Sequence, residues 1–156
     1  MRPILAKWGF PKWDGKGTII NARAESINEK QMFKKLQNNR CTVPASAYFE
    51  WKEKSLGSKA KDKYIIKKQN SILYFAGLYN IIPKHNTDQL SLFDTNDLDI
   101  YYTIITKDAD SSVSHIHNRM PVIFDNNDMN DWLSGKSINN MVKNNNELIT
   151  ELIKQL

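Results

Sequence analysis

The chain has 156 residues, enough for one domain with a hydrophobic core of its own. Apolar residues make up 40% and charged residues 25%, which excludes a fibrous or wholly disordered protein. The single cysteine, Cys41, excludes an intrachain disulfide and suits a reducing cytosol. The first residues lack the apolar stretch of a secretory signal, and no apolar run approaches the roughly 20 residues that cross a bilayer, so no membrane association is predicted. The net charge of +5 favours an anionic partner such as nucleic acid.

The first forty residues predict an irregular opening, one short strand and one helix. Lys7–Trp13 mixes aromatic residues with Gly and Pro, which is typical of a loop. Thr18–Ile20 is a short β-prone run. Ser26 and Glu29 have the spacing of a capping box, so a helix is predicted to begin there and to end at Asn38–Asn39.

The middle of the chain is predicted to form a series of strands separated by polar loops. Alternation along a strand places neighbouring side chains on opposite faces, so Glu50, flanked by Phe49 and Trp51, is predicted from alternation alone to point outward. Polar loops are predicted over Lys52–Lys63 and Pro83–Asp97. The predicted strands are Cys41–Val43, Tyr48–Trp51, Lys63–Lys67, Ile72–Tyr79, Ile100–Thr106 and Pro121–Phe124.

The C-terminal part predicts two helices. Asp125 can cap a short helix that runs through Leu133 and stops at Ser134–Gly135. A last helix is predicted from about Glu147, because the following apolar residues fall on one helical stripe. Strands with occasional helices and without regular β-α-β alternation favour an α+β fold with a largely antiparallel sheet.

Three polar segments stand out because they are embedded in apolar surroundings. Ser114–Pro121 carries two histidines, an amide and an arginine between two predicted buried strands, and a loop held by rigid elements is a common place for chemistry. The other two segments are Asn21–Glu25 and Tyr48–Trp51. We expect the three segments to meet in one site.

The residue types in these segments suit proton transfer on an anionic, carbonyl-like substrate. Glu50 and His117 form an acid–base pair, since histidine titrates near neutral pH. Arg23 and Arg119 can grip phosphates or carboxylates in a bidentate manner. The amide of Asn21 can hold a carbonyl or an oxyanion.

Other sites have weaker support in the sequence. His115 and His117 could bind zinc with Cys41, but paired cysteines and the HExxH spacing are missing, so no metal or cofactor is expected. Ser114 beside His117 could indicate a serine hydrolase, but the GxSxG elbow is missing. The tryptophans near lysines, Trp8 among them, either stack on bases or simply cover the core.

Several blocks of the sequence, in this order and approximate spacing, resemble the SOS-response-associated peptidase (SRAP) family of abasic-site processing proteins. Together they are specific, although each alone is weak, and they cover roughly residues 7 to 133. The blocks are Trp8–Trp13, Asn21–Glu25, Arg40–Ala45, Tyr48–Trp51, Phe75–Leu78, Thr103–Thr106 and His117–Ile123.

The resemblance implies a β-rich α+β fold whose largely antiparallel, bifurcated sheet forms a pseudo-barrel with a few flanking helices. It implies binding of single-stranded DNA at abasic sites during the DNA damage (SOS) response, in the cytoplasm and at the nucleoid. Family members crosslink themselves to the ring-opened sugar through a cysteine that follows the initiator Met. Its amine forms a Schiff base and its thiol closes a thiazolidine. A peptidase activity linked to self-processing is also attributed to the family.

The resemblance also implies roles for the catalytic candidates. Asn21 would position the N-terminal group, Glu50 would be the acid–base carboxylate near the amine, and His117 would protonate the sugar oxygen as the ring opens. This implication reverses the outward orientation that alternation predicts for Glu50.

The same resemblance implies a DNA-binding surface. Arg23 and Arg119 would hold phosphates that flank the lesion, and Thr106 would support them. The base-stacking or wedge surface would be lined by Trp8, Phe10, Pro11 and Trp51.

The start of the chain departs from the family pattern. Family members begin Met-Cys-Gly-Arg, several dozen residues before the Trp-Gly block, whereas this chain begins Met1–Pro3 and soon reaches Trp8. We therefore expect a single family domain over residues 1–156, truncated at its N-terminus. A shortened chain or a misassigned start is favoured over a degenerate relative or a piece that another chain completes. A missing strand would expose a sheet edge and favour self-association.

Two further functions stay open at this point. One is a non-covalent single-stranded DNA-binding module, and the other is a hydrolase or peptidase that acts on an unrelated substrate.

Overall fold

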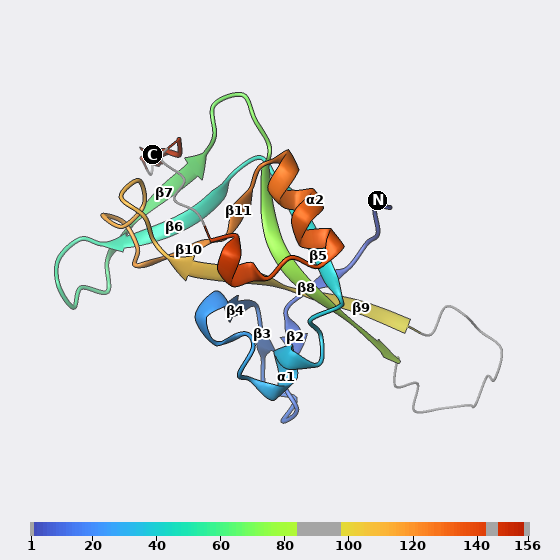
Figure 1. Cartoon of the computed structure of the whole chain (residues 1–156). Helices are drawn as coiled ribbons and strands as arrows, with labels where there is room; N and C mark the ends of the chain where they lie inside the picture. The colour runs from blue at the N-terminus through green and yellow to red at the C-terminus, as the bar shows by residue number, and fades with distance from the viewer. Residues whose placement is uncertain (1, 84–97, 143–146, 155–156) are drawn as a thin grey trace.

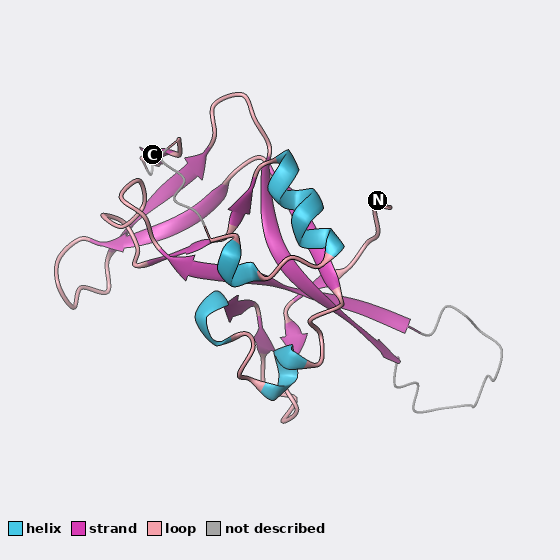
Figure 2. Ribbon diagram, in the orientation of Figure 1, coloured by secondary structure: helices cyan, strands magenta, loops and turns pink. Residues whose placement is uncertain are grey.

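The computed structural model describes residues 2–83, 98–142 and 147–154 (Figure 1). All of the predicted loop Pro83–Asp97 except Pro83 lies outside the described residues. Figure 2 shows strands predominating, with short helices beside them. The elements are β1 (Lys7–Trp8), β2 (Phe10–Pro11), β3 (Thr18–Ile19), β4 (Asn21–Arg23), η1 (Ala24–Ser26), α1 (Gln31–Lys34), β5 (Arg40–Ala45), β6 (Tyr48–Glu53), β7 (Lys61–Lys67), β8 (Leu73–Pro83), β9 (Leu98–Asp108), β10 (Arg119–Pro121), β11 (Ile123–Phe124), α2 (Asn126–Ser134), η2 (Ile138–Asn140) and β12 (Ile149–Leu152).

The central sheet has seven strands within the described residues and is built on the long antiparallel pair β8 and β9. β5 and β11 pair with β8, and β10 pairs with β9, all in the antiparallel sense. β1 and β4 run parallel to β9. The prediction of an α+β fold is confirmed, and the parallel N-terminal strands make the sheet mixed where a largely antiparallel one was expected.

A second sheet of three antiparallel strands has the order β12-β7-β6, and β2 and β3 form a separate hairpin. No strand of the three-stranded sheet is hydrogen-bonded to a strand of the central sheet among the described pairs. The described strands therefore form no closed barrel, and the expected pseudo-barrel is not found as a closed structure.

Two hydrophobic clusters hold the layers together, one on each face of the central sheet. The first is formed with β2, β4, η1, α1, α2 and η2, several of which are labelled in Figure 1. It buries Phe124 and Trp132. The second lies between the central sheet, β7 and the segment after β9, and it buries Ile66 and Ile116. Adjacent residues of β9 separate the clusters, since Ile105 packs in the first and Ile104 in the second. Burial stabilises each large side chain by about 1.5–3 kcal/mol.

The helix predicted after Asp125 is confirmed as α2. The side chain of Asp125 accepts a hydrogen bond of 2.8 Å from the backbone N–H of Asp128, which caps the helix. Gly135 ends it in the left-handed region with φ 112°. Trp132 is 0% exposed, and its Nε1 donates to the carbonyl of Cys41 at 3.0 Å, which ties α2 to β5.

Three predictions of local structure are wrong. The last predicted helix is the strand β12, because β-branched residues such as Ile149 pair with the open edge of β7. The capping box does not form, because Ser26 belongs to η1, and α1 follows only at Gln31–Lys34. The predicted opening loop contains β1 and β2, since β9 and β3 supply partners for its backbone.

Within the described residues, none of the helices combines the length and the apolar character that a bilayer crossing requires.

Candidate functional site

The face of β6 that carries Glu50 is directed inward. Tyr48 and Glu50 are partly buried, whereas Phe49 and Trp51 remain 44% and 47% exposed. Tyr48 packs against the second cluster, so Glu50 lies on the same inward face. The outward orientation predicted from alternation is therefore wrong. Alternation separates the two faces of a strand but does not say which face is covered.

The surroundings of Glu50 favour an acid–base role. Burial raises the pKa of the Glu50 carboxyl, while the charge of His117 and the backbone N–H of Trp51 lower it. Burial also raises the pKa of Tyr48, and the charges of Glu50 and Asp110 add to that rise. Glu50 and His117 thus lie within electrostatic reach of each other, although they belong to distant parts of the sequence.

The loop that carries His117 is fixed by its own backbone. The carbonyl of Asp110 accepts hydrogen bonds from the N–H groups of Val113 and Ser114, at 3.1 and 2.8 Å. The carbonyl of Val113 then accepts from the N–H of Ile116 at 2.8 Å and from that of His117 at 3.2 Å. Val113 and Ile116 are buried in the second cluster, and their packing anchors the loop to the hydrophobic core.

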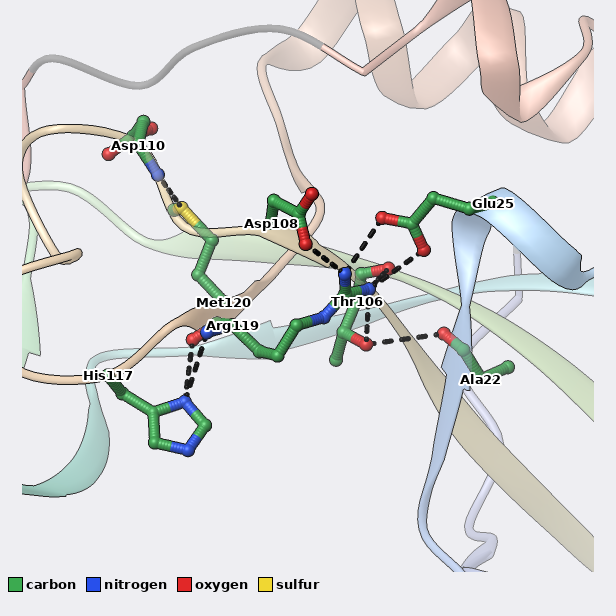
Figure 3. Close-up of polar contacts among 8 residues, drawn as sticks. All are labelled: Ala22, Glu25, Thr106, Asp108, Asp110, His117, Arg119 and Met120. Atoms are coloured by element: carbon green, nitrogen blue, oxygen red, sulfur yellow. Dashed lines mark hydrogen bonds and ion pairs between the residues drawn. The ribbon is translucent and has the colours of Figure 1, made fainter.

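One nitrogen of the His117 ring is occupied by the protein. Nδ1 accepts a hydrogen bond of 3.1 Å from the backbone N–H of Arg119 and lies 3.1 Å from the Arg119 carbonyl oxygen (Figure 3). When Nδ1 accepts, the neutral ring carries its proton on Nε2. Nε2 makes no hydrogen bond with the described residues, so it is the nitrogen left for a substrate.

The Arg119 guanidinium is held by acidic and carbonyl groups (Figure 3). It donates to both carboxylate oxygens of Glu25, at 2.8 and 2.9 Å, and to the carbonyl oxygen of Thr106 at 2.9 Å. A further ion pair joins it to Asp108. The hydrogen bond from Arg119 lowers the pKa of Glu25, and the same contact raises the pKa of Arg119. A phosphate at Arg119, as the resemblance implies, has to compete with these carboxylates.

The strand β4 places Asn21 and Arg23 on the same side of the sheet as the acid–base pair. Ala22 is 1% exposed and packs in the first cluster, so its two exposed neighbours point to the opposite face. Arg23 is in register with Thr106, which faces the side of the second cluster. The hydroxyl of Thr106 lies 3.5 Å from the carbonyl of Ala22 and joins the two strands.

The aromatic candidates divide into exposed and buried residues. Trp8 is 52% exposed, with its Nε1 donating to the carbonyl of Ile20 at 3.0 Å, and Pro11 is also exposed. Phe10 is 3% exposed and packs in the first cluster. Its ring packs in the core, so Phe10 is not accessible to stack on a base, contrary to what the resemblance implies.

An open groove runs between the β6–β7 hairpin and the histidine loop. Its lining includes Trp51, Lys61, His115 and His117. The groove thus connects the exposed Trp51 ring with His117, the candidate proton donor. Cys41 lies in β5, where burial raises its pKa to about 12, which disfavours the nucleophilic thiolate. No group of three metal-ligating side chains occurs among the residues that the structure describes.

Residues 2–154 match the SOS response associated peptidase (SRAP) family. The chain belongs to this family. Its relatives include the abasic site processing protein YoaM of Bacillus subtilis, 38% identical over 138 residues, and the abasic site processing protein YedK of Escherichia coli, 28% identical over 128 residues. These alignments cover 84% and 81% of the present chain but 56% and 52% of the relatives. The SRAP chain thus spans about half the length of the relatives that it matches.

Solved structures share the fold of this SRAP chain. A crystal structure of a protein from Bacteroides thetaiotaomicron superposes with a TM-score of 0.76 at 27% identity, covering 94% of this chain and 67% of the other. A protein from Bordetella bronchiseptica gives the same TM-score of 0.76 at 20% identity, covering 96% and 76%. The second likeness concerns the fold alone.

Sequence reasoning missed the residues that surround the SRAP candidates. Glu25 and Asp108 hold Arg119, and Tyr48 lies beside Glu50 on the inward face. An acidic residue next to a short strand carries no signal of its partner, because the pairing depends on chain segments that lie far apart. The two-residue spacing of Tyr48 and Glu50 is the one signal that could have placed them on a common face.

Proposed function

We propose that this SRAP chain binds single-stranded DNA at an abasic site and supplies the acid–base pair for reaction of the ring-opened sugar. The proposal rests above all on the placement of Glu50 within electrostatic reach of His117. A partly buried carboxyl with a raised pKa lies within electrostatic reach of an imidazole whose Nε2 is free of hydrogen bonds with the described residues.

The chemistry of an abasic sugar matches this pair. Opening the ring to the aldehyde requires a proton on the ring oxygen and removal of the hydroxyl proton. His117 Nε2 donates the first proton, the hydroxyl proton passes to water, and Glu50 exchanges protons with the amine that attacks the aldehyde. The amine adds to the carbonyl carbon and water leaves, which gives an imine. A thiol on the same nucleophile then adds to the imine and closes a thiazolidine, as the family resemblance implies.

The surrounding residues suit an anionic strand. Arg23 is exposed on β4 and reaches a phosphate without breaking an ion pair with a described residue. Asn21 lies two residues away on the same face and holds the reacting group. Trp8 and Trp51 offer exposed rings for bases beside the lesion. Arg119 serves this surface only when Glu25 or Asp108 yields to a phosphate.

The test uses three single-stranded oligonucleotides with the same sequence: one with an abasic site, one with its tetrahydrofuran analogue, and one intact. Native gels measure binding, and denaturing gels with mass spectrometry measure covalent products. Free L-cysteine is added as an external amine and thiol. We expect tighter binding to the abasic strand and faster formation of its cysteine adduct when the protein is present.

Variants assign the roles. Glu50→Gln and His117→Ala should each slow adduct formation by about a hundredfold at saturating DNA. His115→Ala is the matched control, because it removes a neighbouring imidazole of the same loop and should leave the rate unchanged. Equal affinity for the abasic and intact strands would refute abasic recognition, and an unchanged rate in Glu50→Gln would refute the acid–base assignment.

A second candidate is a non-covalent reader of single-stranded DNA, favoured by the exposed tryptophans and Arg23. It predicts binding that weakens with salt, without acceleration of the cysteine adduct.

A further inference from the structure

The outer side of the β6–β7 hairpin carries an exposed layer of two aromatic rings and an ammonium group. The Nζ atom of Lys63 lies 4.1 Å from the centre of the Phe49 ring and 5.7 Å from that of the Trp51 ring. Trp51 is in register with Lys63 across the ladder, so both stand on the same face of the sheet. Phe49 belongs to this face as well, because it is two residues from Trp51. We call these three residues the outer aromatic face.

The fold does not require this arrangement. Phe49 and Trp51 are 44% and 47% exposed, on the face opposite to the hydrophobic cluster. A cation–π contact at an exposed site contributes little to the stability of the sheet, so packing alone does not account for the two rings. Lys63 makes no ion pair with another described residue, and its charge is therefore available to an anionic ligand.

The outer aromatic face is continuous with the groove of the candidate site. Trp51 belongs to both surfaces, and Lys61, which lines the groove, lies next to Lys63 on the same strand face. The groove that contains His117 thus reaches Trp51, and Phe49 lies two residues from Trp51 on the same face of β6. The two lysines lie on the neighbouring strand, with Lys63 opposite Trp51 and Lys61 opposite Glu53.

We propose that the outer aromatic face binds the segment of single-stranded DNA that flanks the lesion. Bases stack on Phe49 and Trp51, while Lys63 and Lys61 face the phosphates. Aromatic rings that stack on bases beside cations that meet phosphates are the general solution for binding single strands without sequence preference. The inference rests on the proposed function for the position of the lesion, but the stacking itself requires only an unpaired strand.

The test compares the affinity for two oligonucleotides by fluorescence anisotropy, with competition for the weaker one. One is an intact oligodeoxythymidylate of about sixteen nucleotides, and the other has about four nucleotides with a central abasic site. Phe49→Ala should weaken binding of the long strand about tenfold and leave the short one unchanged, because the short strand ends within the groove. Phe49→Tyr keeps a ring and should retain the affinity for the long strand.

Charge and apolar surface are tested separately. Lys63→Gln should reduce the slope of log affinity against log salt for the long strand by about 0.7, the loss of one phosphate contact. Ile81→Ala and Lys34→Gln are the controls, since they remove an exposed apolar side chain and an exposed lysine elsewhere and should change neither quantity.

The outcomes separate this inference from the proposed function. Unchanged affinity of Phe49→Ala for the long strand overturns the inference, and so does an equal loss for both strands. A change of oligomeric state in Phe49→Ala, measured by sedimentation, with unaltered DNA binding assigns the face to a second copy of the chain and also overturns it. If abasic and intact strands bind equally but Phe49→Ala still weakens the long strand, the proposed function fails and the outer aromatic face stands.

Discussion

The ion pair between Arg119 and Glu25 should be a measurable source of stability, because it joins η1, which follows β4, to the start of β10. The two hydrogen bonds to Glu25 are bidentate, at 2.8 and 2.9 Å, and the Arg119 side chain is only 18% exposed. The Glu25 side chain is 49% exposed, which reduces the contribution through solvent screening. We expect a coupling free energy of about 1 kcal/mol, between the values typical of surface and buried pairs.

Loss of the whole Arg119 side chain should cost more than the coupling. Arg119→Met also removes the hydrogen bond to the carbonyl of Thr106 and the ion pair with Asp108, so the unfolding free energy should fall by about 2 kcal/mol. Because Arg119 lowers the pKa of Glu25, the contribution of Glu25 is present above pH 4.5 and is lost as the pH falls through its pKa in the folded protein.

The assay is urea unfolding of the wild type, Arg119→Met, Glu25→Gln and the double variant, followed by tryptophan fluorescence. The same cycle on the exposed pair of Lys54 and Asp62, at 3.4 Å, is the control and should give about 0.3 kcal/mol. A coupling no larger than that of the control would refute the structural role of Arg119. Its guanidinium would then be available for phosphate.

Three further predictions concern the site and its support. Glu50→Gln should stabilise the protein at neutral pH and lose this advantage in acid. Burial raises the pKa of Glu50. The stability that its protonated form contributes is therefore present below pH 4.5 and lost as the pH rises through its pKa in the folded protein. Urea unfolding of both proteins across this pH range measures the difference in unfolding free energy. Cys41, whose pKa burial raises to about 12, should react with iodoacetamide far more slowly in the native protein than in urea, as mass spectrometry will show. Gly77→Ala should lower the unfolding free energy by about 1–3 kcal/mol, because the new Cβ would lie 2.9 Å from Cys41 Sγ and 3.0 Å from the Thr103 carbonyl; Ser58→Ala is its surface control.

The sequence predicted the strands well and the helices poorly, for reasons that particular residues show. Leu73–Pro83 and Leu98–Asp108 are long apolar runs whose pairing partners lie close in the chain, so local pattern and fold agree. The apolar stripe after Glu147 is compatible with either a helix or a strand, and the free edge of β7 decides for the strand β12.

The candidate site was only partly predictable. Segment-level reasoning selected Glu50 and His117, and in the structure the charge of His117 acts on the pKa of Glu50. Alternation could not decide the inward orientation of Glu50, because only the second cluster, assembled from β7, β8, β9 and the histidine loop, covers that face of β6. The partners of Arg119 were invisible for the same reason, since Glu25 lies 94 positions away in the chain.

Because side chains alternate along β6, the proposed acid–base role and the proposed base stacking use opposite faces of the same strand. Even positions, Tyr48 and Glu50, face inward toward the second cluster, while odd positions, Phe49 and Trp51, face outward. One residue inserted within this strand would exchange the two sets, placing rings where the acid belongs and the acid in solvent. Residues inserted between Lys54 and Ala60, at the turn of the hairpin, would leave both sets in place. The number of residues in β6 is therefore constrained together with their identities, whereas the turn a few residues farther on can vary in length.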